Sequence, residues 1–221
     1  MIKAIIFDAY GTLISTGNGS VKAAEKILTL NQRGDIDPKE FYARWKELHK
    51  KHIDNLDSFI TEEKIFENDL RELYNLYSIN GDYEKDVQVM LDTLGKRKAF
   101  PETRKVLEFL SQKHIVAIGS TSDTAPLLSD ISNNHLNVAK VFTSESLRVY
   151  KPRKEFYEKI LDALNVSVDE ALFVGDSLID DVEGPQSAGM RACWINRKGG
   201  TAGEYHPDFE INDLRELSGI L

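Results

Sequence analysis

The chain has 221 residues, of which 41% are hydrophobic and 29% are charged, and its formal net charge is −8. The length and apolar content suffice for one large domain, or for a core domain with a smaller one attached. The acidic balance argues against binding to a nucleic-acid backbone, which needs clustered positive charge, and no apolar run approaches the ~20 residues needed to cross a membrane. The single cysteine, Cys193, cannot form an internal disulfide, so we expect a soluble protein of the reducing cytoplasm.

The first predicted element is a strand, because residues 2–7 form a short, nearly continuous apolar run that ends at an acid. From about residue 21 to residue 95 the residues have a charged, long-period character that is typical of helices. The first helix is expected to have Ser20 as its N-cap, and the second to have Pro38 in its first turn. The third and fourth are expected to open near Thr61 and Tyr83.

After residue 100 the pattern alternates between helices and strands. The expected order is helix 102–112, strand 114–120, strand 141–143, helix 154–164, strand 171–175, helix 182–188 and strand 191–195. Alternation of this kind predicts an α/β fold with a Rossmann-like parallel sheet and right-handed crossovers. The earlier helical block interrupts this order, so we predict a core domain of residues 1–14 and 96–221 and an inserted helical cap domain of residues 15–95.

Polar side chains follow the predicted strands. Asp8 follows the first strand, Ser120 and Thr121 follow the second, Lys151 lies in the loop after the third, and Asp176 follows the fourth. In a parallel sheet, ligands bind at the carboxyl ends of the strands. The sequence therefore predicts a functional site built from these residues.

Four short motifs resemble, in order, those of the haloacid dehalogenase superfamily. They are residues 7–13 (Phe-Asp-Ala-Tyr-Gly-Thr-Leu), 118–121 (Ile-Gly-Ser-Thr), 151–152 (Lys-Pro) and 175–184 (Gly-Asp-Ser-Leu-Ile-Asp-Asp-Val-Glu-Gly). The resemblance runs from residue 2 to about residue 196, and the position of the cap after the first motif resembles the helical-cap subfamily. It implies a hydrolase whose carboxylate nucleophile forms a covalent intermediate that water later opens.

The resemblance also implies a role for each residue of the predicted site. Asp8 is the nucleophile, and Ser120 and Thr121 bind the substrate. Ser120 is also expected to take part in catalysis, because its hydroxyl can donate to a substrate oxygen. Lys151 supplies a fixed positive charge for the nucleophile and for the developing anion, and so contributes both to binding and to catalysis. Thr12 either orients Asp8 or caps the following turn.

A metal ion is expected beside these residues, because carboxylates gathered at one point repel one another unless a cation is present. Hard oxygen ligands suit Mg²⁺. By resemblance the ligands are Asp8, the backbone carbonyl of Tyr10, and Asp176, with Asp181 bound directly or one layer further out and Asp180 only a neighbour.

Tyr10 departs from the pattern of the phosphatases in this family, which usually carry a second aspartate there to protonate the leaving group and then activate water. A tyrosine, with a pKa of ~10, cannot easily do this near neutral pH. The dehalogenase branch commonly has Asp-Ala-Tyr-Gly-Thr-Leu at this place. Arg44 resembles the halide-side arginine of that branch, and Tyr157 lies at its spacing from Lys151; a solvated helix arginine and a packing tyrosine are the alternatives.

The fourth motif decides between these branches. Displacing a halide from carbon creates no phosphoryl charge for a metal to neutralise. In the dehalogenase branch of the family the resemblance accordingly implies a metal-free site, which has Ser and Asn where this chain has Asp176. We therefore favour a Mg²⁺-dependent phosphatase that acts on a small phosphorylated metabolite. The alternatives are a 2-haloacid dehalogenase and a phosphate-binding protein with weak turnover.

Other features are expected to be structural. His49 and His52, about one helical turn apart, are expected on a solvated face rather than as zinc ligands. Cys193 is expected to be a buried small hydrophobe. Residues 17–19 are expected to form a hinge between core and cap, and residues 198–203 a flexible loop near the edge of the site.

Overall fold

The structure is a computed structural model that describes all 221 residues, and it divides into two compact units. The larger unit comprises Met1–Ser15 and Lys98–Leu221, and the smaller one comprises Thr16–Arg97. The smaller unit is an insertion in the chain after the first strand of the larger one.

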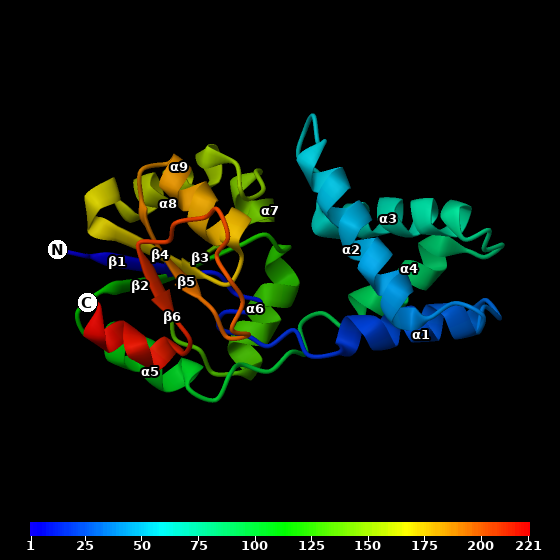
Figure 1. Cartoon of the computed structure of the whole chain (residues 1–221), viewed down its shortest axis with the longest axis horizontal. Coiled ribbons are helices and arrows are strands. Elements are labelled where there is room, and N and C mark those ends of the chain that lie inside the picture. Colours follow the sequence, from blue (N-terminus) through cyan, green and yellow to red (C-terminus); the bar gives the residue numbers. More distant parts are fainter. The chain divides into compact units, whose positions relative to one another are not determined.

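The larger unit is built on a six-stranded sheet with the order β3-β2-β1-β4-β5-β6 (Figure 1). All neighbouring strands are parallel, which confirms the predicted fold class. The strands are β1 (Ala4–Phe7), β2 (Ile115–Ser120), β3 (Lys140–Thr143), β4 (Ala171–Gly175), β5 (Arg191–Ile195) and β6 (Phe209–Ile211). Every residue of β1 and β4 is buried, because both are central strands covered on two faces, and this explains their continuous apolar sequences.

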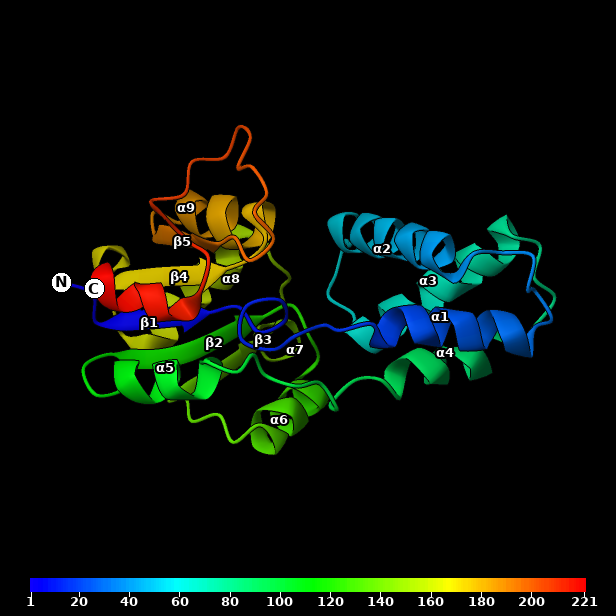
Figure 2. The ribbon, with the colours of Figure 1, turned by 60° about the horizontal axis from the view of Figure 1, so that its bottom comes forward.

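Helices cover both faces of the sheet (Figure 2). One face packs against α5 (Thr103–Leu110), α6 (Thr124–Asn133) and the final 3-10 helix η3 (Leu214–Gly219). The other face packs against α8 (Lys154–Leu164). The short elements of this unit are α7 (Ser144–Leu147), η1 (Val168–Glu170), the π-helix η2 (Leu178–Glu183) and α9 (Gly184–Ser187).

The strand order reverses at β1. From β1 the sheet continues through β2 to β3 on one side and through β4 and β5 to β6 on the other. The chain therefore leaves the carboxyl ends of β1 and β4 in opposite directions, and a crevice forms at this point in open parallel sheets. The topology thus places Asp8 and Asp176 at the point where ligands bind in such folds.

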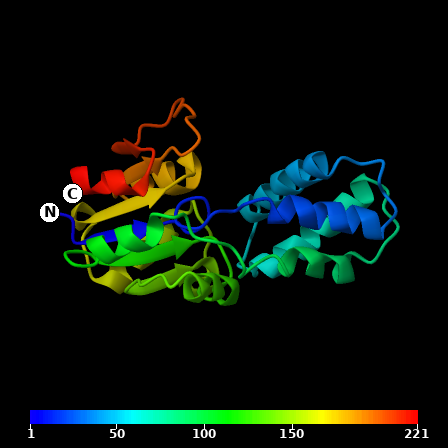
Figure 3. The same cartoon turned by 90° about the horizontal axis from the view of Figure 1, so that it is seen from below.

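The smaller unit consists of four helices packed around one apolar cluster (Figure 3). They are α1 (Gly19–Leu30), α2 (Pro38–Asp54), α3 (Glu62–Leu76) and α4 (Tyr83–Leu91). Pro38 lies in the first turn of α2 as predicted. Ser20 is not the N-cap of α1: that position is Asn18, because the Lys22 amide donates to the Asn18 carbonyl and starts the helix earlier. None of the helices of the structure is long and apolar enough to span a bilayer.

Several elements of the larger unit differ from those predicted from the sequence. The helices α6 and η3 and the strand β6 were not predicted; in α6 a proline, Pro126, lies in the first turn, where it is tolerated but weakens the helical signal. The helix expected at 182–188 is a π-helix from Leu178 followed by α9. It begins earlier because the Asp180 amide donates to the Ser177 hydroxyl directly after β4.

His49 and His52 do not lie on a solvated face, so that prediction is wrong. Their side chains are 20% and 23% exposed, and their Nδ1 atoms lie 2.7 and 2.5 Å from the two carboxylate oxygens of Asp69. Asp69 is fully buried, and it also accepts a hydrogen bond from Trp45 Nε1. A buried carboxylate needs donors around it, so the two imidazoles turn inward and join α2 to α3.

The contact with Asp69 predicts how stability depends on pH. Burial disfavours the imidazolium, but the hydrogen bond and charge of Asp69 outweigh it and raise the pKa of His49. The stabilisation is therefore fully present below the unfolded pKa of ~6.5 and is lost as the pH rises through the folded value. Between about pH 6 and pH 9 we expect the thermal midpoint of wild type to fall more than that of His49→Gln. Equal falls, measured by circular dichroism, would contradict this.

Candidate active site

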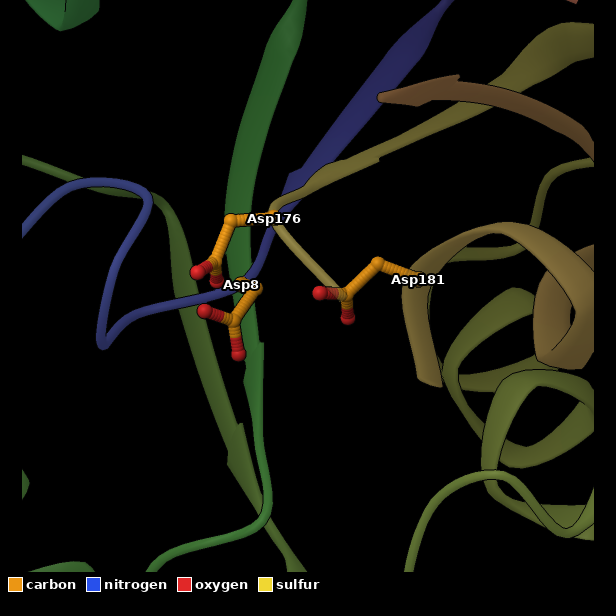
Figure 4. Close-up of side chains that lie close together, drawn as sticks. All are labelled: Asp8, Asp176 and Asp181. Carbon is orange, nitrogen blue, oxygen red and sulfur yellow. The ribbon is translucent and has the colours of Figure 1, made fainter. Parts of the chain in front are cut away.

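Three aspartates meet at the carboxyl ends of the central strands (Figure 4). Asp8 follows β1, Asp176 follows β4, and Asp181 lies on η2. One carboxylate oxygen from each lies within 4.8 Å of the others, and Asp180 is not in this group. The structure thus brings together the three acidic side chains that the sequence analysis assigned to a metal site.

Lys151 places a buried positive charge between two of these carboxylates. Its Nζ donates to Oδ1 of Asp8 and to Oδ1 of Asp181, each at 2.8 Å, and its side chain is 1% exposed. The ring centre of Phe173 lies 5.1 Å from the same nitrogen. Burial alone would lower the pKa of Lys151, but Asp181 and Asp8 outweigh it and raise that pKa. The two carboxylates therefore favour the charged ammonium form of Lys151.

One ammonium does not balance three carboxylates. Burial raises the pKa of Asp8 to about 7, against the effect of Lys151 and with that of Asp181. Burial and Asp181 also raise the pKa of Asp176 to about 6. Oδ2 of Asp8 is buried and has no hydrogen-bond partner. Raised carboxyl pKa values and an unpartnered carboxylate oxygen fit a site that takes a hard cation through oxygen ligands.

Two glycines permit the close approach of the aspartates. Gly11 has φ +103°, and a Cβ on it would lie 2.4 Å from Oδ2 of Asp176. A Cβ on Gly175 would lie 2.2 Å from the carboxyl carbon of Asp181. Any larger residue at either place would displace a carboxylate, so the glycines of the first and fourth motifs are required by sterics.

Asp181 and Asp176 differ in how they are held. Both oxygens of Asp181 are engaged, Oδ1 by Lys151 and Oδ2 by the Ser177 amide at 2.9 Å. Asp176 is anchored through its backbone carbonyl, which accepts from Trp194 Nε1 at 3.1 Å. Asp181 is therefore the partner that fixes Lys151, and the carboxylate of Asp176 is left for other contacts.

The remaining predicted residues lie around this group in different ways. Ser120 is 1% exposed at the end of β2, and its hydroxyl accepts a hydrogen bond from Ser122 at 3.0 Å. Thr121 is half-buried beside it. The Thr12 hydroxyl is buried and unpartnered, so it forms neither of the two hydrogen bonds considered for it. The sequence analysis did not name Ser122 as a residue of the site. Its position two residues after Ser120, just beyond the end of the same strand, was the signal that could have identified it.

Tyr10 is held by a residue that the sequence analysis did not consider. Its hydroxyl donates to Oδ2 of Asp130 at 2.9 Å, and Asp130 is fully buried on α6. The bond joins residues 120 positions apart in an element that was not predicted, so no sequence signal was available. The phenol proton is directed to Asp130, which makes Tyr10 a poor source of protons for a leaving group.

The two features that resemble the dehalogenase branch have structural roles. Tyr157 is fully buried, packs edge-on against Phe156 and Phe173, and donates its hydroxyl to the backbone carbonyl of Asp180. The Arg44 side chain is 44% exposed and pairs with Glu47 at 2.6 Å. They are a packing tyrosine and a solvated helix arginine, the alternatives considered for them.

Cys193 is fully buried, as predicted. Burial raises the pKa of its thiol to about 12, which makes it unreactive as a nucleophile.

Comparison with known proteins agrees with this geometry. Residues 2–189 match the family model of the haloacid dehalogenase-like hydrolases. The chain belongs to this family. It is therefore a hydrolase, with an α/β core and an inserted helical unit.

Its relatives include both enzyme types that the motifs resemble. The chain is 29% identical to phosphatase MT3486 of Mycobacterium tuberculosis, over 100% of this chain and 97% of that one. It is 25% identical to (S)-2-haloacid dehalogenase 4A of Burkholderia cepacia, over 100% of this chain and 95% of that one. The HAD-hydrolase YfnB from Bacillus subtilis, solved bound to magnesium, has the same fold, with a TM-score of 0.85 at 20% identity over 100% of this chain and 98% of that one.

The buried charge of Lys151 leads to a stability prediction. In Lys151→Met, Asp8 and Asp181 lose their shared cation, and breaking a buried ion pair of this kind costs ~3–5 kcal/mol. The loss should be largest near about pH 8 and smaller near about pH 5, because the pKa of Asp8, raised to about 7, lets this carboxylate take up a proton at the lower pH.

The measurement is urea unfolding at both pH values with a chelator present. Lys154→Met is the control, since Lys154 is 57% exposed and pairs with Glu158 on the surface. A loss of stability equal at both pH values would show that protonation of Asp8 does not relieve the loss of Lys151.

Proposed function

We propose that this hydrolase is a Mg²⁺-dependent phosphatase that acts on a small phosphorylated metabolite through a phosphorylated Asp8. The observation that carries the proposal is the third carboxylate. Lys151 alone could support a free Asp8 nucleophile, but the addition of Asp176 beside it is unfavourable unless a cation shares the site.

The chain's own ligands fit such a cation. Asp8 Oδ2 and the carboxylate of Asp176 would hold it, together with the backbone carbonyl of Tyr10, and Asp181 would support it through Lys151 and solvent. When bound, Mg²⁺ neutralises charge on the phosphoryl oxygens. The magnesium in the structure of the relative YfnB supports this choice of metal.

Each residue of the site has a separate role in the proposed reaction. The Asp8 carboxylate attacks phosphorus, the bond from phosphorus to the leaving oxygen breaks, and water later opens the resulting acyl phosphate. Lys151, fixed by Asp181, stabilises the negative charge that develops on the phosphoryl oxygens. Ser120 and Thr121 offer hydroxyls to the substrate. The inserted helical unit of residues 16–97 serves as the cap that selects the substrate.

Phosphate release from a panel of phosphorylated metabolites, with and without Mg²⁺, tests the proposal. Asp8→Asn preserves the shape of the nucleophile and should abolish release. Asp176→Asn should raise the Mg²⁺ requirement steeply or end activity. The matched control is Asp180→Asn, because Asp180 is a neighbouring acid outside the carboxylate group, and it should retain turnover. Activity that persists in a chelator would remove the metal from the mechanism.

A 2-haloacid dehalogenase is the second candidate, supported by the residues Asp-Ala-Tyr-Gly-Thr-Leu and by the full-length dehalogenase relative. Halide release from chloroacetate, assayed in parallel without metal, distinguishes the two reactions. Phosphate binding without turnover of any substrate would instead identify a binding protein.

The hydrogen bond of Tyr10 to Asp130 predicts which class of phosphate the protein hydrolyses faster. A general acid contributes ~10²–10⁴-fold in rate, and a phenol that donates to Asp130 does not supply one. Aryl and acyl phosphates leave as weak bases, so they should turn over faster than alkyl phosphates. Tyr10→Asp should raise the rate on alkyl phosphates more than on aryl ones.

The ratio of the alkyl to the aryl rate is the measurement, in wild type and in Tyr10→Asp. Tyr10→Phe is the control, because it also releases Asp130 but introduces no acid. If a folded Tyr10→Asp leaves the ratio unchanged, Tyr10 does not mark a missing acid.

A further inference from the structure

A largely buried arginine contacts the backbone of the nucleophile loop, the segment of residues 8–14 that follows β1. Arg197, two residues beyond the end of β5, reaches back and donates from Nη2 to the backbone carbonyl of Thr12 at 2.8 Å. The two residues are 185 positions apart in the sequence. Arg197 does not contact the three aspartates, so its relation to the reaction runs through the backbone of this loop.

The guanidinium of Arg197 is fixed on two further sides. Its Nη2 lies 2.7 Å from Oε1 of Glu102, and its carbon lies 3.8 Å from the ring centre of Phe100. The side chains of Arg197 and Glu102 are only 16% and 10% exposed. A planar guanidinium that is stacked, paired and largely buried has little freedom. The contact with Thr12 is therefore a built feature of the fold, unlike the exposed ion pairs of the surface.

The same part of the chain holds the next carbonyl of the loop. The Leu13 carbonyl accepts from the Phe100 amide at 3.0 Å and from the Thr103 hydroxyl at 2.8 Å. Two successive peptide groups of the nucleophile loop are thus fixed from outside, one by Arg197 and one by the segment 100–103.

The loop has little room for displacement. Gly11 lies so close to Asp176 that an added Cβ would come within 2.4 Å of its carboxylate. A shift of the loop changes the spacing between Asp8 and Asp176, which belong to different strands. A misplacement of about 1 Å in an active site costs as much as ~10²-fold in rate.

We infer that Arg197 is a positioning residue for the hydrolytic reaction: it fixes the peptide at Thr12 and thereby the place of Asp8 relative to Asp176. The inference rests on Asp8 being the nucleophile of the proposed function. It does not depend on whether the group transferred to Asp8 is phosphoryl or alkyl.

The test compares Arg197→Ala with wild type in whichever assay, phosphate or halide release, shows turnover. We expect kcat to fall by about 10-fold or more and KM to change by less than about two-fold, because the loop orients the nucleophile without being the binding surface. Added guanidinium ion should restore part of kcat. Arg104→Ala is the control, since Arg104 is 59% exposed and pairs with Glu108 on the same helix.

Amide hydrogen exchange provides a readout that does not depend on activity. The Leu13 and Ile14 amides donate to the Ala9 carbonyl within the loop. In Arg197→Ala these amides should exchange faster while those of β1 stay protected. Glu102→Gln, a milder variant that keeps the contact with Thr12 but weakens the ion pair, should show a smaller change of both kinds.

Each result of these experiments either supports or overturns the role of Arg197. Unchanged kcat in a folded Arg197→Ala, or faster exchange throughout the larger unit in place of the loop alone, overturns the inference. If Arg197→Ala does not fold, unchanged kcat and loop exchange in Glu102→Gln overturn it. If wild type releases halide and no phosphate, the proposed function fails but the test of Arg197 proceeds on halide release.

Discussion

The site depends on one buried ammonium held between two carboxylates. Parallel strands bring Asp8 and Asp176 to the same edge of the sheet, and η2 adds Asp181. Such crowding is unfavourable in a desolvated site. Lys151 compensates for part of it, which holds the site together without a ligand but leaves the carboxyl pKa values raised. The remaining imbalance is the charge that a bound cation would offset in the proposed phosphatase reaction.

The rest of the larger unit fixes the positions of these charges. The two glycines of the first and fourth motifs set the distances between backbone and carboxylates. Contacts such as that of Trp194 with the Asp176 carbonyl hold the loops that carry these charges. An active site whose charges repel one another needs support of this kind, because the loops that carry the charges would otherwise relax apart.

Tyr10 is engaged in a structural hydrogen bond at the edge of the candidate site. Its hydroxyl is bound to Asp130, so the position that would protonate a leaving group is occupied by a structural hydrogen bond. The proposal of phosphoryl transfer over displacement of halide rests on Asp176. The relatives include both activities, which agrees with a fold that hosts more than one reaction.

The sequence by itself determined the parallel sheet, the inserted helices and the family, because apolar periodicity and short motifs are local signals. It also named the three aspartates and Lys151, although their catalytic roles remain predictions. Only the tertiary structure decided how those groups are held. Lys151 and Asp8 are 143 residues apart, Tyr10 and Asp130 are 120 apart, and the inward turn of His49 depends on Asp69 in another helix. Buried polar contacts join distant segments, and their partners are fixed by packing, which leaves no periodic trace in the sequence.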